Sequence, residues 1–254
     1  MKLRFVILLL VAAAALLPYD AVTDVHPELA DAGASAAHWL GTDHLGRDVL
    51  RRLCAGGRAF FVPGLLALAV AGSLGGALGA AAGWFGGLVA TTIRAVTGAV
   101  AAIPAFGLVL LVLLVFGPGP LPLGVAAGVT AVPAVAEALY ARLDALRRAE
   151  FVLAARAHGV SDARIFAWHL LWINGRDVVL RELAATLGTV LVTEVTLSYL
   201  GEFGVPEPTP SWGNLIAHAL STGSTNPLAA AAPVAAVLLT LWATTPPREQ
   251  PWPS

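Results

Sequence analysis

Charged residues are scarce in this chain of 254 residues, where they make up 12% of the sequence. Soluble domains carry about 25%, so the chain has roughly half of the usual share. Hydrophobic residues make up 57%, and so little polar surface cannot cover them in a globule. The composition therefore excludes an ordinary water-soluble domain. The net charge of -1 excludes a basic nucleic-acid-binding protein, so we expect no nucleic acid among its partners.

Cysteine and lysine are almost absent. Cys54 is the only cysteine, which excludes an intramolecular disulfide and a metal site made of several cysteines. Lys2 is the only lysine, whereas the phosphate-binding loop of a P-loop ATPase ends in Lys followed by Ser or Thr. The chain therefore cannot itself be such an ATPase, and its composition indicates an integral membrane protein.

Long stretches without a charged residue predict most of the membrane spans, because a helix that crosses a bilayer needs about 20 apolar residues. These stretches are 59–93, 95–136 and 208–247. The sequence Gly117-Pro118-Gly119-Pro120 is typical of a turn and divides the middle stretch. With two further apolar segments, we predict an all-α membrane protein of about six helices, near 5–17, 63–84, 95–116, 122–140, 178–200 and 227–244.

The first predicted helix has two interpretations. Lys2 and Arg4 precede a short apolar run, Phe5–Leu17, and this pattern also describes a cleaved signal peptide. Tyr19 would suit the membrane interface and favours a retained anchor. We expect three regions: an N-terminal anchor with an extracytoplasmic segment (1–62), a transmembrane core (63–245) and a short C-terminal tail (246–254).

The distribution of basic residues predicts the orientation, since cytoplasmic loops carry an excess of Lys and Arg. With both termini inside, ten basic residues lie inside and four lie outside. This N-in, C-in arrangement places a loop at about 141–177 on the inner side. It places a second loop at about 201–226, which contains no Lys or Arg, on the outer side.

The inner loop has the features of a docking element. We predict two short helices in it, with Ser161 as a plausible cap of the second and Asp162 near its positive dipole end. Small residues would let a partner approach the backbone closely, and these are Ala154, Ala155 and Gly159. The residues alone also fit a second interpretation, a solvated amphipathic loop with ordinary inner arginines.

The outer segments read as a scaffold. Asp43, Arg47 and Asp48 are placed to form an ion-pair and capping network before a short helix at 48–58. Prolines stiffen the later outer loop because each fixes its own backbone angle, and they are Pro206, Pro208 and Pro210. We expect Trp212 to anchor that loop at the bilayer surface.

Small residues and prolines mark the apolar spans. Glycines recur at intervals of four, a spacing that lets membrane helices pack closely: Gly75, Gly79, Gly83 and Gly87, with Gly72 and Gly76 repeating it. Pro104 and Pro133 predict kinks in the third and fourth spans. Glu194 is an acid at membrane depth, read either as a functional group or as a structural acceptor near the outer end of its helix.

Three motifs are more specific than generic membrane sequence. They are Leu40-Gly41-Thr42-Asp43-His44-Leu45-Gly46-Arg47-Asp48; Glu150-Phe151-Val152-Leu153-Ala154-Ala155-Arg156-Ala157-His158-Gly159 with His169 further on; and Leu197-Ser198-Tyr199-Leu200-Gly201 followed by Pro208-Thr209-Pro210-Ser211-Trp212-Gly213. In this order and spacing they resemble the permease subunits of binding-protein-dependent ABC importers. The similar branch is the one for dipeptides, oligopeptides and nickel.

The resemblance implies a fold, a location and a set of partners. The fold is that of a type I ABC-importer permease with a cytoplasmic coupling helix, and the location is the bacterial inner membrane. The chain would form half of a translocation path without being an enzyme or binding a cofactor or metal. The partners are a homologous second permease, two ATPase subunits that use ATP and Mg²⁺, an extracytoplasmic binding protein and membrane lipid.

The resemblance also suggests roles for individual residues. Coupling to the ATPase falls to Glu150, Ala154, Ala155, Arg156, Gly159, Asp162 and His169. The outer scaffold and docking surface comprises Gly41, Thr42, Asp43, Gly46, Arg47, Asp48, Pro210, Ser211, Trp212 and Gly213. The chain departs from the family at Leu153, where a Glu usually opens the coupling signature, and at Trp172, where a proline is usual. Its tail also lacks the usual basic residues.

The substrate and the class of transporter stay open at this point. Peptides are the expected substrate, with nickel or another small solute as the alternative. An ion-coupled secondary transporter is the alternative from another class, and it would show more midplane acids than Glu194 and an inverted repeat. His158 and Asp162 are four residues apart, but they have no third ligand near them in the sequence.

Overall fold

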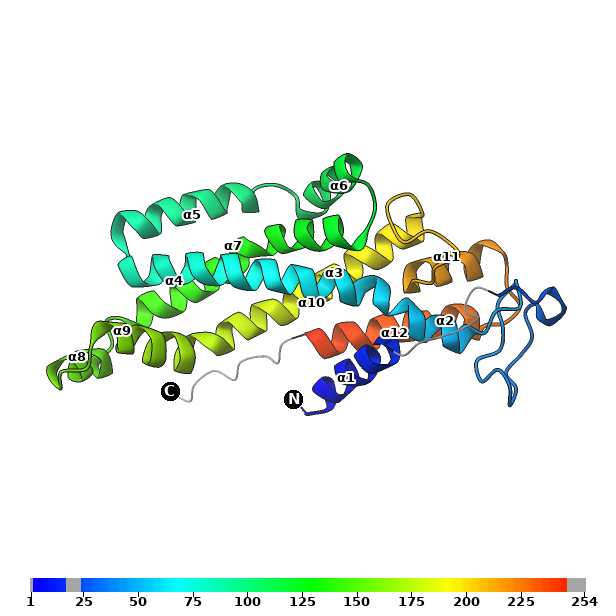
Figure 1. Cartoon of the computed structure of the whole chain (residues 1–254), viewed down its shortest axis with the longest axis horizontal. Coiled ribbons are helices and arrows are strands. Elements are labelled where there is room, and N and C mark those ends of the chain that lie inside the picture. Colours follow the sequence, from blue (N-terminus) through cyan, green and yellow to red (C-terminus); the bar gives the residue numbers. More distant parts are fainter. Residues whose placement is uncertain (1, 17–23, 246–254) are drawn as a thin grey trace. The chain divides into compact units, whose positions relative to one another are not determined.

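The computed structural model describes residues 2–16 and 24–245, and within these ranges it is built of helices without a β-strand (Figure 1). One isolated bridge pairs Thr42 with Asp48. The prediction of an all-α protein is confirmed. The expectations for Tyr19 and for the tail at 246–254 fall outside the described residues.

The helices follow one another through most of the chain. In order they are α1 (Lys2–Leu16), the 3₁₀ turn Pro27–Leu29, α2 (Val49–Gly56), α3 (Arg58–Val70), a π-helical stretch (Ala71–Gly75), α4 (Gly76–Phe85), α5 (Gly87–Ala101), α6 (Ala105–Phe116), α7 (Pro120–Leu146), α8 (Glu150–Ala157), α9 (Asp162–Arg164), a second π-helical stretch (Ile165–Gly175), α10 (Arg176–Leu200), α11 (Trp212–Ser221) and α12 (Leu228–Thr244).

Within the described residues, five of the six predicted spans fall on a continuous helical stretch, and the third falls on two helices, α5 and α6. Within the described ranges, three continuous helical stretches are long and apolar enough to cross a membrane: Val49–Phe85, Pro120–Leu146 and Asp162–Leu200. The pair α5 and α6 passes the same test as one span bent by 74°, and α1 and α12 are shorter apolar helices. The number of crossings and their orientation stay predictions.

The bounds of two spans differ from those predicted. The helix that contains the second span begins at Val49, and the fifth begins at Asp162 instead of near 178. The apolar stretch Ile165–Gly175 continues the fifth helix through π-helical turns, whereas the predicted loop at 141–177 had included it. Because α7 extends to Leu146, the segment that links it to Asp162 is shorter than the predicted loop at 141–177.

Proline accounts for the break in the third span. Pro104 lies between α5 and α6, where the helix axis bends by 74°. A proline lacks the N–H that would continue the helical ladder, and its ring crowds the preceding turn. The predicted kink at Pro104 is therefore present as a break. At the other predicted position, α7 runs through Pro133 as one helix.

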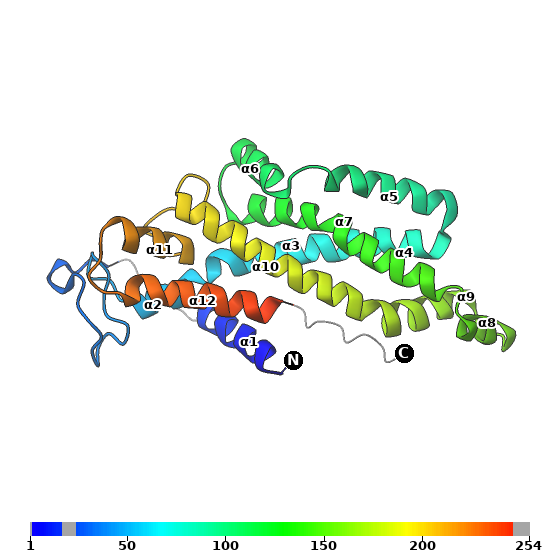
Figure 2. The same cartoon turned by 180° about the vertical axis from the view of Figure 1, so that it is seen from behind.

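The chain divides into two compact units. The first comprises residues 1–65, 110–124 and 188–254, and in it α11 packs against α12 while both contact α2. Figure 2 shows α1 beside α12, as does the opposite view in Figure 1. The second comprises 66–109 and 125–187, where α4 contacts α5. Its apolar core is formed by Leu139, Leu143, Val152, Ile165 and Leu170.

Candidate functional sites

An ion-pair network joins the first and third motifs within the first unit. The Asp43 carboxylate accepts from Arg47 Nε at 2.7 Å and from two backbone N–H groups. Arg47 also donates to Glu207 at 2.8 Å. Arg52 donates to the same carboxylate, with Nη2 lying 2.9 Å from Oε1. The expected pair of Asp43 and Arg47 is present, and Asp48 caps α2 by accepting from the Arg51 N–H at 2.8 Å.

At two positions of the first motif, the backbone conformation and the close surroundings allow only glycine. Gly41 has φ of 73°, and a Cβ there would lie 2.4 Å from the Ala32 carbonyl oxygen. Gly46 has φ of 75°, and a Cβ would lie 1.8 Å from a backbone oxygen. Asn226, from the start of α12, donates to the carbonyl oxygens of Leu40 and Thr42 at 2.9 and 3.0 Å. This motif is thus held as a fixed turn against the start of α12.

The third motif forms the start of α11. Ser211 caps this helix, accepting from the Asn214 N–H at 3.1 Å, while Asn214 Oδ1 accepts from the Ser211 N–H at 2.9 Å. Such a reciprocal pair satisfies backbone groups that a helix end leaves free. At Gly213, a Cβ would lie 2.3 Å from the Val195 carbonyl oxygen, so only glycine allows α11 to approach α10 so closely.

The expectation that Trp212 anchors a loop at the bilayer surface is wrong. Its side chain is buried, and the residue is only 3% exposed. The indole Nε1–H donates to the Leu53 carbonyl oxygen at 2.8 Å, and the ring packs against Phe60 with centroids 5.3 Å apart. A buried indole finds a hydrogen-bond partner of this kind when it serves as a core residue. Trp212 therefore fastens α11 to α2 and α3.

Nearly all of the outer residues singled out in the sequence are buried. The buried ones are Gly41, Thr42, Asp43, Gly46, Arg47, Pro210, Ser211, Trp212 and Gly213, and Asp48 is half-buried. These residues form a scaffold, and their burial leaves little of them for direct docking. The sequence assigned no role to Arg52, Glu207 or Asn226, because each acts on residues of a distant segment. A signal was present in Glu207, which interrupts a proline-rich loop with a charge.

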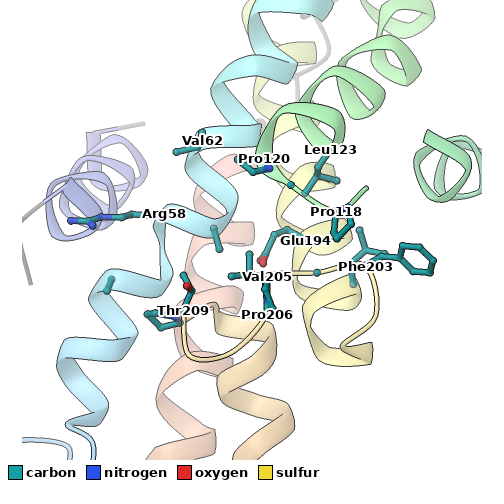
Figure 3. Close-up of a pocket in the computed structure, with 16 residues that line it drawn as sticks. Arg58, Val62, Pro118, Pro120, Leu123, Glu194, Phe203, Val205, Pro206 and Thr209 are labelled. Atoms are coloured by element: carbon teal, nitrogen blue, oxygen red, sulfur yellow. The ribbon is translucent and has the colours of Figure 1, made fainter. Parts of the chain in front are cut away.

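Glu194 lies at the wall of a cavity within the first unit. The cavity has a volume of about 600 Å³ and is lined by α3, α10, the turn before α7 and the loop at 203–210. Figure 3 shows Glu194 at this wall, whereas Arg58 points away and donates to the Ala15 carbonyl oxygen. Glu194 accepts from Ser198 Oγ at 2.6 Å and from the Ser211 hydroxyl. Ser198 Oγ in turn accepts from the Val205 N–H at 2.9 Å. The carboxylate thus holds the loop and the start of α11 on α10.

Helix α8 in the second unit has one buried side and one exposed side. Val152 is buried in the core cluster, and Ala155 packs against the same cluster. On the other side, Phe151 and Leu153 are 41% and 59% exposed, and Glu150, Ala154 and Arg156 are exposed as well. Ala155 is half-buried and packs against the chain's own core, so only part of its surface faces outward. Phe151 and Leu153 lie beside the residues expected to dock, and the sequence did not single them out for docking.

Gly159 ends this helix and does not continue it. Helix α8 stops at Ala157, and Gly159 has φ of 77°. Its N–H donates to the Arg156 carbonyl oxygen, and the Val160 N–H donates to that of Ala155, both at 3.0 Å. This is the Schellman arrangement, which favours glycine at the left-handed position. Gly159 therefore does not continue the helix that carries Ala155, because the helix ends between them.

The second helix of this segment begins where it was predicted to begin. Ser161 is at the N-cap of α9, but its side chain makes no cap hydrogen bond. Asp162 instead accepts from Arg156 Nε at 2.8 Å, which ties the two helices together. His169 lies further along, and its carbonyl oxygen accepts from the Asn174 side chain at 2.6 Å. Its Nδ1 is buried and has no hydrogen-bond partner among the described residues.

The glycine ladder packs against α7. A Cβ at Gly75 would lie 2.8 Å from Val135 Cβ, one at Gly79 would lie 2.6 Å from the Ala136 carbonyl oxygen, and one at Gly83 would lie 2.5 Å from Leu143 Cβ. Only glycine allows the two backbones to approach to this distance. Other members of the pattern differ: the space around a Cβ at Gly76 and Gly87 is open.

Comparison with known proteins identifies the family. Residues 75–245 match the family model described as "Binding-protein-dependent transport system inner membrane component". The chain belongs to this family. It is 31% identical over 241 residues to the glutathione transport system permease protein GsiD of Pectobacterium atrosepticum, covering 93% of this chain and 79% of the relative. It is 29% identical to the dipeptide transport system permease protein DppC of Alkalihalophilus pseudofirmus, covering 82% and 68%.

A third relative extends the comparison within the same family. The probable D,D-dipeptide transport system permease protein DdpC of Escherichia coli is 28% identical over 206 residues, covering 81% of this chain and 68% of the relative. The resemblance seen in the three motifs is confirmed. As a member of this family of inner membrane components, the permease chain is a multi-pass protein of the bacterial inner membrane.

Proposed function

We propose that this chain forms half of the translocation path of an ATP-driven importer of short peptides. The names of the three relatives support the substrate class, since glutathione and dipeptides are short peptides. None of these three is named for nickel, so peptides are preferred over the nickel alternative. The second half of the path would come from a homologous permease, and a binding protein would deliver the substrate.

The exposed side of α8 is the observation that carries the coupling part of this proposal. It presents Phe151 and Leu153 to the surroundings from a helix that is fixed by Val152 and by its glycine end. A rigid helix with exposed apolar side chains is suited to a groove of another protein. Two ATPase subunits would supply this groove and use ATP and Mg²⁺, and the chain itself would bind no cofactor and catalyse no reaction.

The same arrangement gives a route for the coupled motion. The core cluster that receives α8 contains Leu139 and Leu143 of α7 as well as Ile165 and Leu170 of the fifth span. A pull on α8 would therefore act on two spans at once. Interfaces with packed cores have discrete arrangements, which suits a switch between two conformations of the path.

Uptake by the reconstituted importer tests the proposal. The chain is co-expressed with a second permease, the ATPases and the binding protein, and it is placed in liposomes. We expect ATP-dependent accumulation of a labelled dipeptide or of glutathione. Accumulation driven by an ion gradient without ATP would contradict the proposal, as would transport of nickel in place of peptides.

A further inference from the structure

A half-exposed ion pair links α5 and α7 in the second unit. Arg94 Nε lies 2.9 Å from Glu137 Oε2, and Arg94 Nη2 lies 3.0 Å from Oε1. The guanidinium group also lies over the ring of Tyr140, 4.9 Å from its centroid. The side chains of Arg94 and Glu137 are 50% and 48% exposed. This geometry is the two-pronged contact that an arginine makes with a carboxylate.

The pair lies in a segment that is otherwise apolar. Glu137 is in α7, a helix long and apolar enough to cross a membrane, and it precedes the end of α7 at Leu146 by nine residues or about 14 Å of helix. Charged groups at such positions are costly when they face lipid, and they normally face water or another protein. A half-exposed pair at this position therefore indicates a face that lipid does not cover.

A cavity opens beside the same pair. Its volume is about 600 Å³, within the range of small-ligand sites, and it lies next to the break between α5 and α6. Besides the two charges it is lined by Thr97, Gly98, Pro104, Thr130 and Pro133, among others. The hydroxyls of Thr97 and Thr130 donate to backbone carbonyl oxygens of their own helices. They therefore add polar groups to the wall of the cavity without bonding to Arg94 or Glu137.

We propose that this cavity belongs to the translocation path and that Arg94 and Glu137 contact the charged ends of the peptide in transit. This inference rests on the proposed function. A free peptide carries an ammonium group and a carboxylate group, so Glu137 can accept from the first while Arg94 donates to the second. When the path is empty, the two side chains neutralise each other. Replacing the Arg94–Glu137 contact by contacts with the peptide leaves none of the four charged groups without a partner. These contacts must also be weak enough to release the solute, as passage through a path requires.

Water accessibility tests the location of the cavity. In the complete importer with Cys54→Ser, a cysteine is introduced by Gly98→Cys, where the space around a Cβ is open. Val96→Cys is the matched control, because Val96 is 60% exposed on the same helix and does not line the cavity. We expect a charged, membrane-impermeant thiol reagent to modify position 98 and not position 96, and a transported dipeptide with ATP to slow the modification. Equal lack of reaction at both positions would show that the cavity faces lipid and would overturn the inference.

A second result would also overturn it. If position 98 reacts in the isolated chain and is blocked in the importer regardless of substrate, a partner permease covers the cavity. Wild-type importer without ATP-dependent uptake would instead refute the proposed function. Wild-type uptake with an unreactive position 98 refutes only the path assignment.

Charge variants test the role of the pair. We expect Glu137→Gln to assemble and to retain ATP hydrolysis, while dipeptide uptake falls roughly tenfold from loss of one charge-assisted contact. If the ion pair has only a structural role, the double variant Arg94→Glu with Glu137→Arg should take up dipeptide as the wild type does. The inference predicts that the exchanged variant assembles but transports poorly, because its charges meet the peptide in reverse order. Full uptake by the exchanged variant, or by Glu137→Gln, would overturn it. Thr91→Val on the exposed side of α5 is the control and should behave as the wild type.

Discussion

Arg52 and Glu207 form an ion pair across 155 positions of the sequence, with Arg52 Nη2 lying 2.9 Å from Glu207 Oε1. Glu207 accepts from Arg47 through its other oxygen at 2.8 Å. The side chain of Arg52 is fully buried. One carboxylate from the proline-rich loop therefore meets Arg47 of the first motif and Arg52 of α2. It links two segments that are far apart in the sequence.

Removing Glu207 should destabilise the first unit. Glu207→Ala leaves Arg52 and Arg47 without this acceptor in a buried setting, and we expect a loss of about 3 kcal/mol in the free energy of unfolding. Glu202→Ala is the control, because Glu202 is exposed in the same loop, and its effect should stay within about 0.5 kcal/mol. Thermal unfolding of the purified chain in detergent gives both values, and equal stability of the two variants would contradict the role assigned to Glu207.

Substitution of two glycines on α4 by alanine should change the stability of the chain in opposite directions. A Cβ at Gly79 meets the Ala136 carbonyl oxygen at 2.6 Å, so Gly79→Ala forces α4 and α7 apart at a cost of about 1–3 kcal/mol. Gly76→Ala meets open space and gains helix propensity of roughly 0.5–1 kcal/mol. Both variants are compared by resistance to unfolding in mixed detergent micelles. Destabilisation of the same size at both sites would show that helix contact is not the cause.

The orientation should be testable at two exposed positions. Thr222 follows α11 and His158 follows α8, and both are exposed. In a Cys54→Ser background, we expect Thr222→Cys to react with an impermeant reagent in intact cells. His158→Cys should react only after the inner face is opened. Both sites suit labelling better than Trp212 and its neighbours, whose burial would prevent reaction from either side. The reverse pattern would invert the topology derived from the basic residues.

The positions of the helices were predictable because apolar runs and proline breaks act locally. Pro104 gives the break between α5 and α6, and the glycine spacing gives the face that packs on α7. The start of the fifth helix was misplaced because Arg176 and Asp177 look like the end of a loop, although the helix passes through them. Local sequence patterns indicate helix propensity, but they do not show whether an exposed charged residue lies in a loop or within a continuous helix.

Partners across the sequence were not predictable. Trp212 looks like an interfacial aromatic until the Leu53 carbonyl oxygen and the Phe60 ring are placed beside it. Glu137 was assigned to the end of a span, and nothing local to it indicates Arg94 on another helix. Such contacts depend on how separate helices approach each other, which the residue pattern of one helix does not contain.

The last prediction concerns the exposed side of α8. Leu153→Glu places a charge on an exposed apolar side chain, so the chain should insert and fold as the wild type does. If an ATPase groove covers this side, burial of that charge should weaken binding roughly tenfold or more. Val152→Ala changes the buried side instead and should lower stability by about 1–2 kcal/mol without removing the docking surface.

Gly159 is a poor site for this experiment, because φ of 77° strains any other side chain and would mix a folding defect with a docking defect. Ala145→Glu near the end of α7 is a better control, since Ala145 is exposed and lies outside α8. The measurements are co-purification of the ATPase and substrate-stimulated ATP hydrolysis in liposomes. Leu153→Glu should lose both, and Ala145→Glu should keep both. If Leu153→Glu keeps both at wild-type levels, α8 is not the coupling helix, because a carboxylate could not be buried there without loss of binding.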